Sequence, residues 1–235
     1  MKKLFFLIIA FYTVANGYSQ TSEDYCKSGL EKQKINNFQG AIDDYTKAIG
    51  LDPNHAFAYY SRGTTNHYIK NYQSALLDYT KAIEINPKYA VVYCARGTIN
   101  YVLKNYQSAL LDYTKAIEIN PEFSFAYFCR ASIKIELQDT RGAMADYNKT
   151  IEFNPNSEDG YLDRGILKNE LKDKRGALAD FNKTLEINPN NAKAYYGRGM
   201  VKILLQQRES GCLDFSKAGE LGYEDAYDAI KNLCN

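Results

Sequence analysis

The eighteen-residue segment KNYQSALLDYTKAIEINP occurs twice in this chain, at residues 70–87 and again at 104–121. The two copies lie thirty-four residues apart, and the same spacing recurs through most of the sequence. A period of this length is typical of a linear array, in which each unit is one supersecondary element that stacks on its neighbours. The repeat therefore excludes most globular folds before any other feature is considered.

Several columns of residues follow this period. The only five prolines of the chain are Pro53, Pro87, Pro121, Pro155 and Pro189. A second column is tyrosine in six units: Tyr25, Tyr59, Tyr93, Tyr127, Tyr161 and Tyr195. Four residues later comes a small residue: Gly29, Gly63, Gly97, Ala131, Gly165 and Gly199. A register kept this strictly over six units indicates tandem copies of one structural element.

Each unit is predicted to contain two helices. In the unit 56–89, Tyr59 and Gly63 belong to a first helix, and Asn71 suits the N-cap of a second helix, as do Asn105, Asp139 and Asp173 in their units. The second helix carries its apolar residues on one face: Ala75, Leu76, Tyr79, Ala82 and Ile83. It should end at Asn86, because a residue before proline disfavours the helical region.

On these residues the chain resembles the tetratricopeptide repeat proteins. The family motif, from the first aromatic residue to the closing proline, corresponds here to Tyr59, Gly63, Ala75, Tyr79, Ala82 and Pro87. The resemblance covers residues 22 to about 221 and implies an all-α fold, a right-handed α-solenoid of about six helix hairpins with a C-terminal capping helix. The closing segment, from Gly211 onwards, is also similar to the end of many exported bacterial proteins of this type.

The domain organisation follows from the register. Residues 20–235 are expected to form one solenoid domain, with a capping helix at 223–234. The expected repeats are 22–55, 56–89, 90–123, 124–157, 158–191 and 192–222. The final helix would shield the open end of the stack from water. The alternative for this helix is docking to a partner.

The first nineteen residues are predicted to be a signal peptide. Lys2 and Lys3 precede an apolar run from Leu4 to Ala15, and small residues follow. A membrane anchor is the alternative, but a span needs about 20 apolar residues. The expected location is therefore outside the cytoplasm of a bacterium, in the periplasm, secreted or associated with the cell surface.

Composition and motifs argue against several functions. The formal net charge of +1 gives no broad field for nucleic acid or an anionic membrane. No Gly-rich phosphate loop, nucleophile elbow or CxxC pair is present in the sequence. Of the two histidines, His55 falls in a loop and His67 has no ligand partner at regular spacing. We therefore expect no enzyme activity, no catalytic residue, no metal site, no small-molecule cofactor and no nucleic-acid partner.

An arginine column and an aspartate column are predicted to pair within the hairpins. The arginines lie eight residues before the centre of the turn and the aspartates eight after it, so both lie at the same height. The expected pairs are Arg62 with Asp78, Arg96 with Asp112, Arg130 with Asp146, Arg164 with Asp180, and Arg198 with Asp214. The aspartate of the neighbouring unit, Asp44 for Arg62, is the alternative. Recurrence in every unit favours a structural role.

The five cysteines suggest one disulfide in an exported chain. Cys212 opens the last second helix and Cys234 ends the final helix, so antiparallel packing would bring them together. The alternative is two ordinary small apolar thiols. The other three, Cys26, Cys94 and Cys129, lie on first helices of different units and are expected to be unpaired.

The family resemblance implies a concave groove lined by the first helices. The family's groove positions correspond to Phe57, Tyr60, Thr64, His67, Tyr68, Val91, Cys94, Thr98, Tyr101, Val102, Phe125, Phe128, Ser132, Ile135 and Glu136. These positions lack the Lys, Arg and Asn residues with which some relatives hold a C-terminal carboxylate. The lining is aromatic and apolar and suits an apolar peptide or a partner helix, unless the side chains pack against one another.

The function expected from these features is a protein–protein interaction scaffold that binds a protein or peptide in this groove. The alternative is a structural subunit of a cell-envelope or secretion assembly. The sequence does not name the partner.

Overall fold

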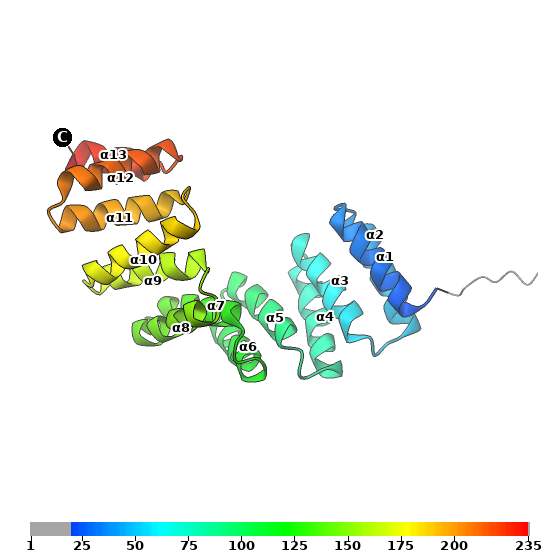
Figure 1. The fold of residues 1–235 in the computed structure, drawn as a ribbon. Helices are drawn as coiled ribbons and strands as arrows, with labels where there is room; N and C mark the ends of the chain where they lie inside the picture. Colours follow the sequence, from blue (N-terminus) through cyan, green and yellow to red (C-terminus); the bar gives the residue numbers. More distant parts are fainter. Residues whose placement is uncertain (1–19, 235) are drawn as a thin grey trace, which may run out of the picture.

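The computed structural model describes residues 20–234, which form thirteen α-helices and no β-strand (Figure 1). The predicted signal peptide lies outside the described residues. The helices are α1 (Ser22–Lys34), α2 (Phe38–Leu51), α3 (Ala56–Tyr68), α4 (Tyr72–Ile85), α5 (Ala90–Val102), α6 (Tyr106–Ile119), α7 (Ser124–Glu136), α8 (Thr140–Phe153), α9 (Glu158–Glu170), α10 (Lys174–Ile187), α11 (Ala192–Leu204), α12 (Arg208–Glu220) and α13 (Asp225–Leu233). The first twelve form six hairpins, so the fold is the predicted α-solenoid.

The N-caps of the second helices are of two kinds, with and without a side-chain hydrogen bond. Asp139 and Asp173 accept hydrogen bonds from the backbone N–H groups of Gly142 and Gly176, both at 2.9 Å. Asn71 and Asn105 occupy the predicted cap position, but their side chains make no such bond. Their units carry Ser74 and Ser108 in place of glycine. A Cβ built on Gly142 would lie 2.7 Å from the Asp139 carboxylate carbon, so a residue with a side chain crowds this cap geometry in the second helices.

The turn inside each hairpin places one non-glycine residue in the left-handed region. The φ angles lie between 59° and 66° at Asn36, Lys70, Lys104, Gln138, Lys172 and Gln206. Around Lys70, the backbone N–H of Asn71 donates to the carbonyl of Asn66 at 2.8 Å, and that of Lys70 to His67 at 2.9 Å. This is the Schellman arrangement, which satisfies the last carbonyls of a helix. It reverses the chain in the same way in each of the six units.

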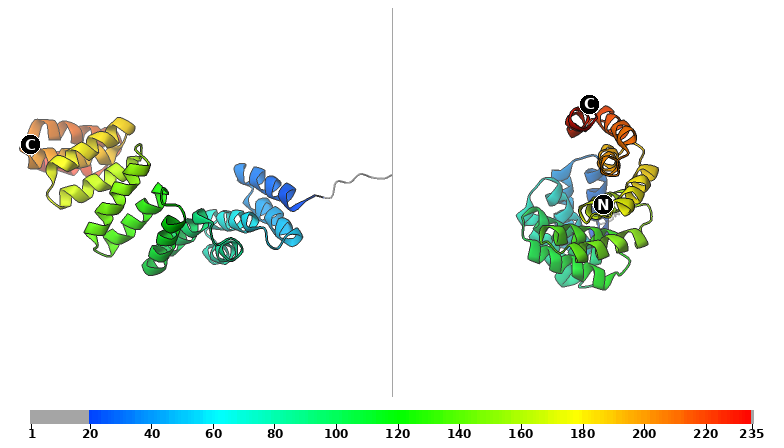
Figure 2. Two further views of the ribbon diagram at one scale, coloured as in Figure 1. Left: turned by 60° about the horizontal axis from the view of Figure 1, so that its bottom comes forward. Right: turned by 90° about the vertical axis from the view of Figure 1, so that its left-hand side faces the viewer.

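The hairpins stack along a coil whose inner side is formed by the first helices. Figure 2 shows an elongated body from one side and hairpins arranged around a common axis from the other. First helices of successive hairpins contact one another, as in α1 with α3, α3 with α5, α5 with α7, and α9 with α11. The second helices make no comparable contacts with one another in the described chain. The first helices therefore line the tighter, concave side.

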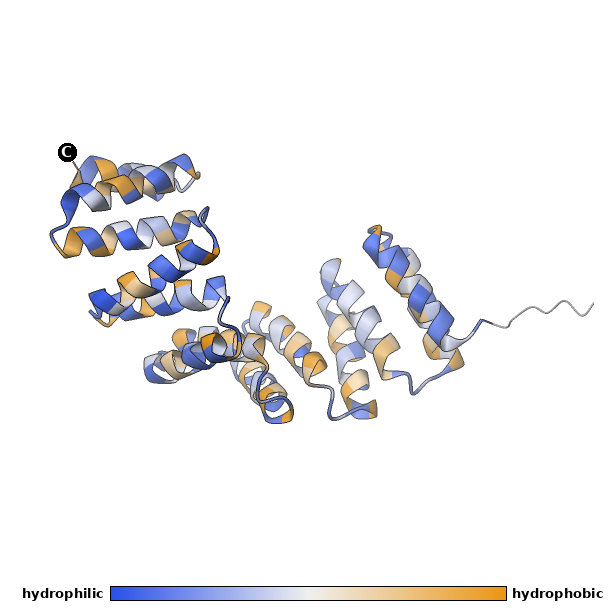
Figure 3. Cartoon of the chain, viewed as in Figure 1, coloured by the Kyte–Doolittle hydropathy of each residue, from blue (hydrophilic) through white to orange (hydrophobic). Residues whose placement is uncertain are grey.

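The core lies between the two helices of each hairpin and between neighbouring hairpins. A fully or almost fully buried aromatic ring of the second helix recurs at Tyr45, Tyr79, Tyr113, Tyr147, Phe181 and Phe215. The glycine column makes room for it, because a Cβ on Gly63 would lie 2.8 Å from Cε1 of Tyr79. Every helix carries both hydrophilic and hydrophobic residues (Figure 3). No helix among residues 20–234 is long and apolar enough to cross a bilayer.

The C-terminal helix α13 covers the last hairpin. It buries Ala226 and Ala229 against α12, and the Tyr227 hydroxyl donates to the carbonyl of Gly219 at 3.0 Å. Cys212 and Cys234 form a disulfide with their Cα atoms 5.8 Å apart. The helix therefore has the position expected of a cap, two residues shorter at its start than the predicted range.

Candidate partner-binding groove

A repeated arginine–aspartate ion pair joins the two helices of each of five hairpins. In each of five hairpins the arginine guanidinium makes two hydrogen bonds to the aspartate of the same hairpin, at 2.7–3.1 Å. These are the predicted partners: Arg62–Asp78, Arg96–Asp112, Arg130–Asp146, Arg164–Asp180 and Arg198–Asp214. The alternative partner Asp44 instead pairs with Lys32 at 2.6 Å in its own hairpin. The guanidinium and the carboxylate lie at the same height, which allows the bidentate geometry.

The same arginines also join neighbouring hairpins. Arg96 donates through Nη1 to the Thr80 hydroxyl of the preceding hairpin at 3.2 Å, and Arg164 donates to Asn148 at 2.8 Å. Each guanidinium of the column lies over a tyrosine of the first helix, with Arg96 5.7 Å from the centre of the Tyr93 ring. The tyrosine column thus supports the arginine column by a cation–π contact.

The sequence reasoning missed a further partner of the aspartates. One helical turn after each arginine, a polar side chain reaches the same carboxylate. It is lysine in three hairpins, at Lys134, Lys168 and Lys202, and asparagine in two, at Asn66 and Asn100. The signal was present in the sequence, because this column also follows the thirty-four-residue period and lies four residues after the arginine on the same face.

The predicted groove residues separate into two groups on the first helices. One group is exposed: Tyr68 by 68%, Phe125 by 52% and Val102 by 47%, together with Ile135 and Glu136. The other group is partly buried: Phe57, Tyr60, Thr64, His67, Val91, Thr98, Tyr101, Phe128 and Ser132. Apart from Glu136, the first group is apolar or aromatic, and the Tyr68 ring also stacks on Phe38 of α2 with centroids 5.9 Å apart.

Several rings of the second group pack against core rings. Tyr60 lies 6.1 Å from Tyr79 and 5.6 Å from Tyr89, and Phe128 lies 6.1 Å from Tyr147, as ring centroids. His67 packs on Tyr72 at 5.9 Å, and burial lowers its pKa. These side chains form the floor of the groove rather than its open surface.

Cys94 was predicted in the groove and is buried instead, with 2% of its surface exposed. It packs with Ala109, Tyr113 and Ala126. Its side chain is too short to reach the concave surface, whereas Tyr60 and Phe128 extend to it from equivalent positions. Cys26, Cys94 and Cys129 are free thiols in the structure.

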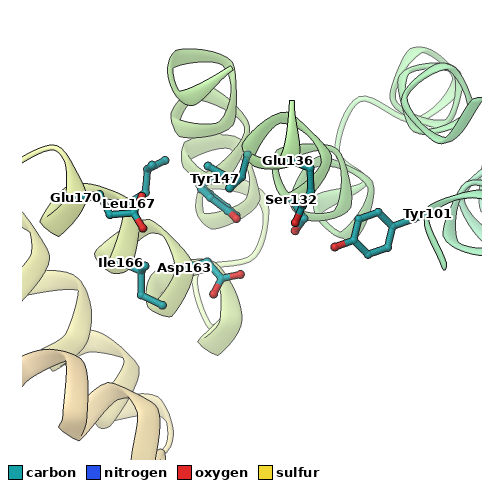
Figure 4. Close-up of a pocket in the computed structure, with 9 residues that line it drawn as sticks. Tyr101, Ser132, Glu136, Tyr147, Asp163, Ile166, Leu167 and Glu170 are labelled. Atoms are coloured by element: carbon teal, nitrogen blue, oxygen red, sulfur yellow. The ribbon is translucent and has the colours of Figure 1, made fainter. Parts of the chain in front are cut away.

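A cavity of about 270 Å³ opens where α5, α7 and α9 meet over the second helix α8 (Figure 4). It is lined by Tyr101, Ser132, Ile135, Glu136, Tyr147, Asp163, Ile166, Leu167 and Glu170. Three of these residues are acidic, and the lining contains no basic residue. Burial and the nearby Asp159 raise the pKa of Asp163 to about 6, against a smaller opposing effect of Lys193.

The sequence reasoning found four of the nine lining residues and missed Asp163 and Glu170. Glu170 occupies the groove position of Glu136 in the next unit, so extending the column by thirty-four residues would have found it. Asp163 lies outside the groove columns, in one whose other members are Lys27, Ser61, Ala95, Cys129 and Gly197. The signal available in the sequence was that Asp163 is acidic where most equivalent positions of the other units hold a small residue.

Comparisons with known proteins agree with this architecture. Family models of the tetratricopeptide repeat match residues 25–55, 56–89 and 90–123. No curated protein sequence matches the chain significantly.

Solved structures share the fold at low sequence identity. PilF of Pseudomonas aeruginosa is 18% identical with a TM-score of 0.80, over 88% of this chain and 96% of that one. YrrB, described as a TPR protein with an unusual peptide-binding site, is 23% identical with a TM-score of 0.67, over 80% and 97%. A tetratricopeptide repeat protein of Parabacteroides merdae is 22% identical with a TM-score of 0.64, over 92% and 100%.

Tetratricopeptide repeats indicate a protein–protein interaction scaffold, and proteins of this fold generally bind proteins or peptides without catalysing a reaction. The hairpin of the three matched units recurs in all six. With the matching family models, this chain carries tetratricopeptide repeats at residues 25–123, and the hairpins that follow have the same architecture.

Proposed function

We propose that this protein is a non-enzymatic scaffold that holds a peptide or a segment of a partner protein on its concave face. The observation that carries the proposal is the exposed apolar surface on the first helices, formed by Tyr68, Val102 and Phe125. Apolar side chains that remain this exposed on a concave surface usually mark an interaction site. The peptide-binding site in the name of YrrB supports the same use of this fold.

The test uses the exposed residues, because their replacement leaves the core intact. Peptides selected from a random display library on the immobilised protein should contain apolar or aromatic residues. Their binding should be lost in the variant Tyr68→Ser/Val102→Ser/Phe125→Ser, with an unchanged melting temperature. The matched control is Leu77→Ser/Leu111→Ser/Leu213→Ser, which changes three exposed residues of the second helices. Equal loss in both variants would contradict groove binding.

The proposal includes export to the periplasm or the surface of a bacterial cell. The basic and then apolar start of the sequence supports it, and so does the disulfide between Cys212 and Cys234, because disulfides persist in oxidising compartments. The bacterial sources of PilF and the Parabacteroides protein favour such an origin. Cell fractionation, with mass spectrometry of the N-terminus, tests this; a full-length chain in the cytoplasm would contradict it.

The second candidate is a structural subunit of an envelope or secretion assembly. The exposed leucines Leu77 and Leu111 favour it, because they occupy equivalent places on the outer, second helices. Sedimentation velocity at several concentrations distinguishes the two. Association that disappears in the Leu77→Ser/Leu111→Ser/Leu213→Ser variant would support assembly through this outer face.

A further inference from the structure

The acidic cavity contains a residue, Asp163, that departs from the thirty-four-residue repeat. Such departures distinguish one part of the groove from another. A residue that recurs in every unit serves the stack, whereas a residue present in one unit acts locally. In units two, three, four and six the position of Asp163 holds a small residue, Ser61, Ala95, Cys129 or Gly197. The carboxylate of Asp163 is thus specific to this point of the solenoid.

The three carboxylates of the cavity have no basic residue among the residues that line it, and Lys193 has only a minor effect on Asp163. Glu136, Asp163 and Glu170 make no ion pair in the described part of the chain, unlike the buried aspartates of the second helices, such as Asp112 and Asp146. Figure 4 shows the Asp163 carboxylate and the Tyr101 hydroxyl directed toward the same space. Asp163 and Glu136 both raise the pKa of Tyr101, after burial, which places their charges close to it.

A second, independent feature is the hydroxyl of Tyr147. The residue is 3% exposed and its hydroxyl points into the cavity (Figure 4). The equivalent Tyr79 and Tyr113 donate to threonine hydroxyls at 3.4 and 3.1 Å. The corresponding residue beside Tyr147 is Ser132, whose hydroxyl donates to the Phe128 carbonyl at 3.2 Å and interacts with the Tyr147 side chain.

The surroundings of the Tyr147 ring also differ from those of its equivalents. It packs against Ala131, whereas Tyr79 and Tyr113 face Gly63 and Gly97. Its hydroxyl lies at the wall of the cavity, where a ligand can reach it.

We propose that this cavity binds the side chain of a lysine or arginine of the partner segment. The three carboxylates attract the cationic end, the Tyr101 ring accepts a cation–π contact, and the Tyr147 hydroxyl accepts a hydrogen bond from it. Ile135, Ile166 and Leu167 cover the methylene stem, as apolar walls do for long basic side chains. The inference rests on the proposed function, since it names the chemistry of the partner in the same groove.

An organic cation fits the cavity better than a metal ion. Among residues 20–234, no group of three or more carboxylate, thiol or imidazole side chains converges in a way that could hold a metal. Phe125 and Phe128 line a neighbouring cavity of about 260 Å³ together with Asp159. The partner segment should therefore carry an apolar or aromatic residue close to its basic one.

The experiment compares two probes of nearly the same shape. N-acetyl-arginine amide and N-acetyl-citrulline amide are titrated into the ¹⁵N-labelled protein, and amide shifts are followed by NMR. We expect the arginine probe to shift the amides around Ser132, Asp163 and Ile166, and the citrulline probe to have a much weaker effect. In the variant Glu136→Gln/Asp163→Asn/Glu170→Gln, the affinity for the arginine probe should fall roughly tenfold, because three partly exposed carboxylates no longer attract its guanidinium.

The control variant Glu84→Gln/Glu118→Gln/Glu152→Gln removes the same net charge from the second helices. It should retain the wild-type response. Equal binding of both probes, or no shift at the cavity, would overturn the inference. Display-selected peptides that need Tyr68 and Phe125 but contain no basic residue would overturn it while leaving the proposed function intact.

Discussion

Arg96 and Asp112 face each other across one hairpin and form two parallel hydrogen bonds, Nη2 to Oδ1 at 2.7 Å and Nε to Oδ2 at 3.1 Å. The carboxylate is almost buried, and the guanidinium also reaches Thr80 of the preceding hairpin. One residue pair thus holds both the hairpin and its contact with the neighbouring unit.

We expect Asp112→Ala to lower the free energy of unfolding by about 2–3 kcal/mol, because it leaves a partly buried guanidinium without its carboxylate. The control is Glu118→Ala, which removes the exposed partner of Lys115 and should cost less than about 1 kcal/mol. Urea denaturation measures both. Similar losses of unfolding free energy in the two variants would show that the buried pair stabilises the protein no more than an exposed ion pair does.

Gly63→Ala should destabilise the protein by about 1–3 kcal/mol, because the new methyl group would collide with the Tyr79 ring at 2.8 Å. Gly50→Ala is the matched change. Nothing lies within 4 Å of a Cβ at this position in α2. The higher helix propensity of alanine should therefore stabilise the Gly50→Ala protein by about 0.5–1 kcal/mol. Thermal melting of the two variants should therefore shift in opposite directions.

Lys104→Gly should stabilise the protein by about 0.5–1 kcal/mol. Lys104 has φ of 61°, where a Cβ costs about 1–2 kcal/mol, and part of the gain is offset by the freedom of glycine in the unfolded chain. Lys115→Gly, inside α6, should instead cost about 1 kcal/mol. Chemical denaturation checks both signs. A destabilised Lys104→Gly variant would mean that the turn holds no strain.

Reduction of the disulfide should weaken the C-terminal cap by about 3 kcal/mol, since the bond joins residues 22 apart in sequence. Hydrogen exchange should then rise first in α13. The variant Cys212→Ser/Cys234→Ser should exchange rapidly with or without reductant. Unchanged protection of α13 after reduction would indicate that packing of Ala226 and Ala229 alone secures the helix.

Asp163→Asn should change how stability depends on pH. The folded-state pKa of about 6 lies above the ordinary value of 3.8, so ionisation of Asp163 disfavours the folded state. The wild type should lose stability relative to the variant as pH rises from about 4 to 6, by at most about 3 kcal/mol. The groups acting on Asp163 are Asp159 and Lys193. Parallel stability curves for the two proteins between pH 4 and 7 would contradict this effect.

Much of the architecture could be predicted because the decisive contacts are local. Register alone places Arg62 and Asp78 at the same height, and the proline column marks the ends of the first five second helices. The six turn residues could not be predicted, because Lys70 or Gln138 carries no glycine signal for a left-handed conformation. Their φ is imposed by the reversal that both helices require.

The candidate site was only partly visible in the sequence. The columns located Tyr101, Ser132 and Glu136, since these positions follow the repeat. The same columns also predicted Cys94 in the groove, which is wrong, because the next hairpin covers its short side chain.

The sequence by itself determined the period, the hairpins and the pairs inside them, because these depend on residues close together in the chain. Only the tertiary structure decided that Asp163 faces Tyr101 and Tyr147 across one cavity. The physical reason is that this meeting depends on how successive hairpins are rotated against each other, which is set by side-chain packing along the whole interface.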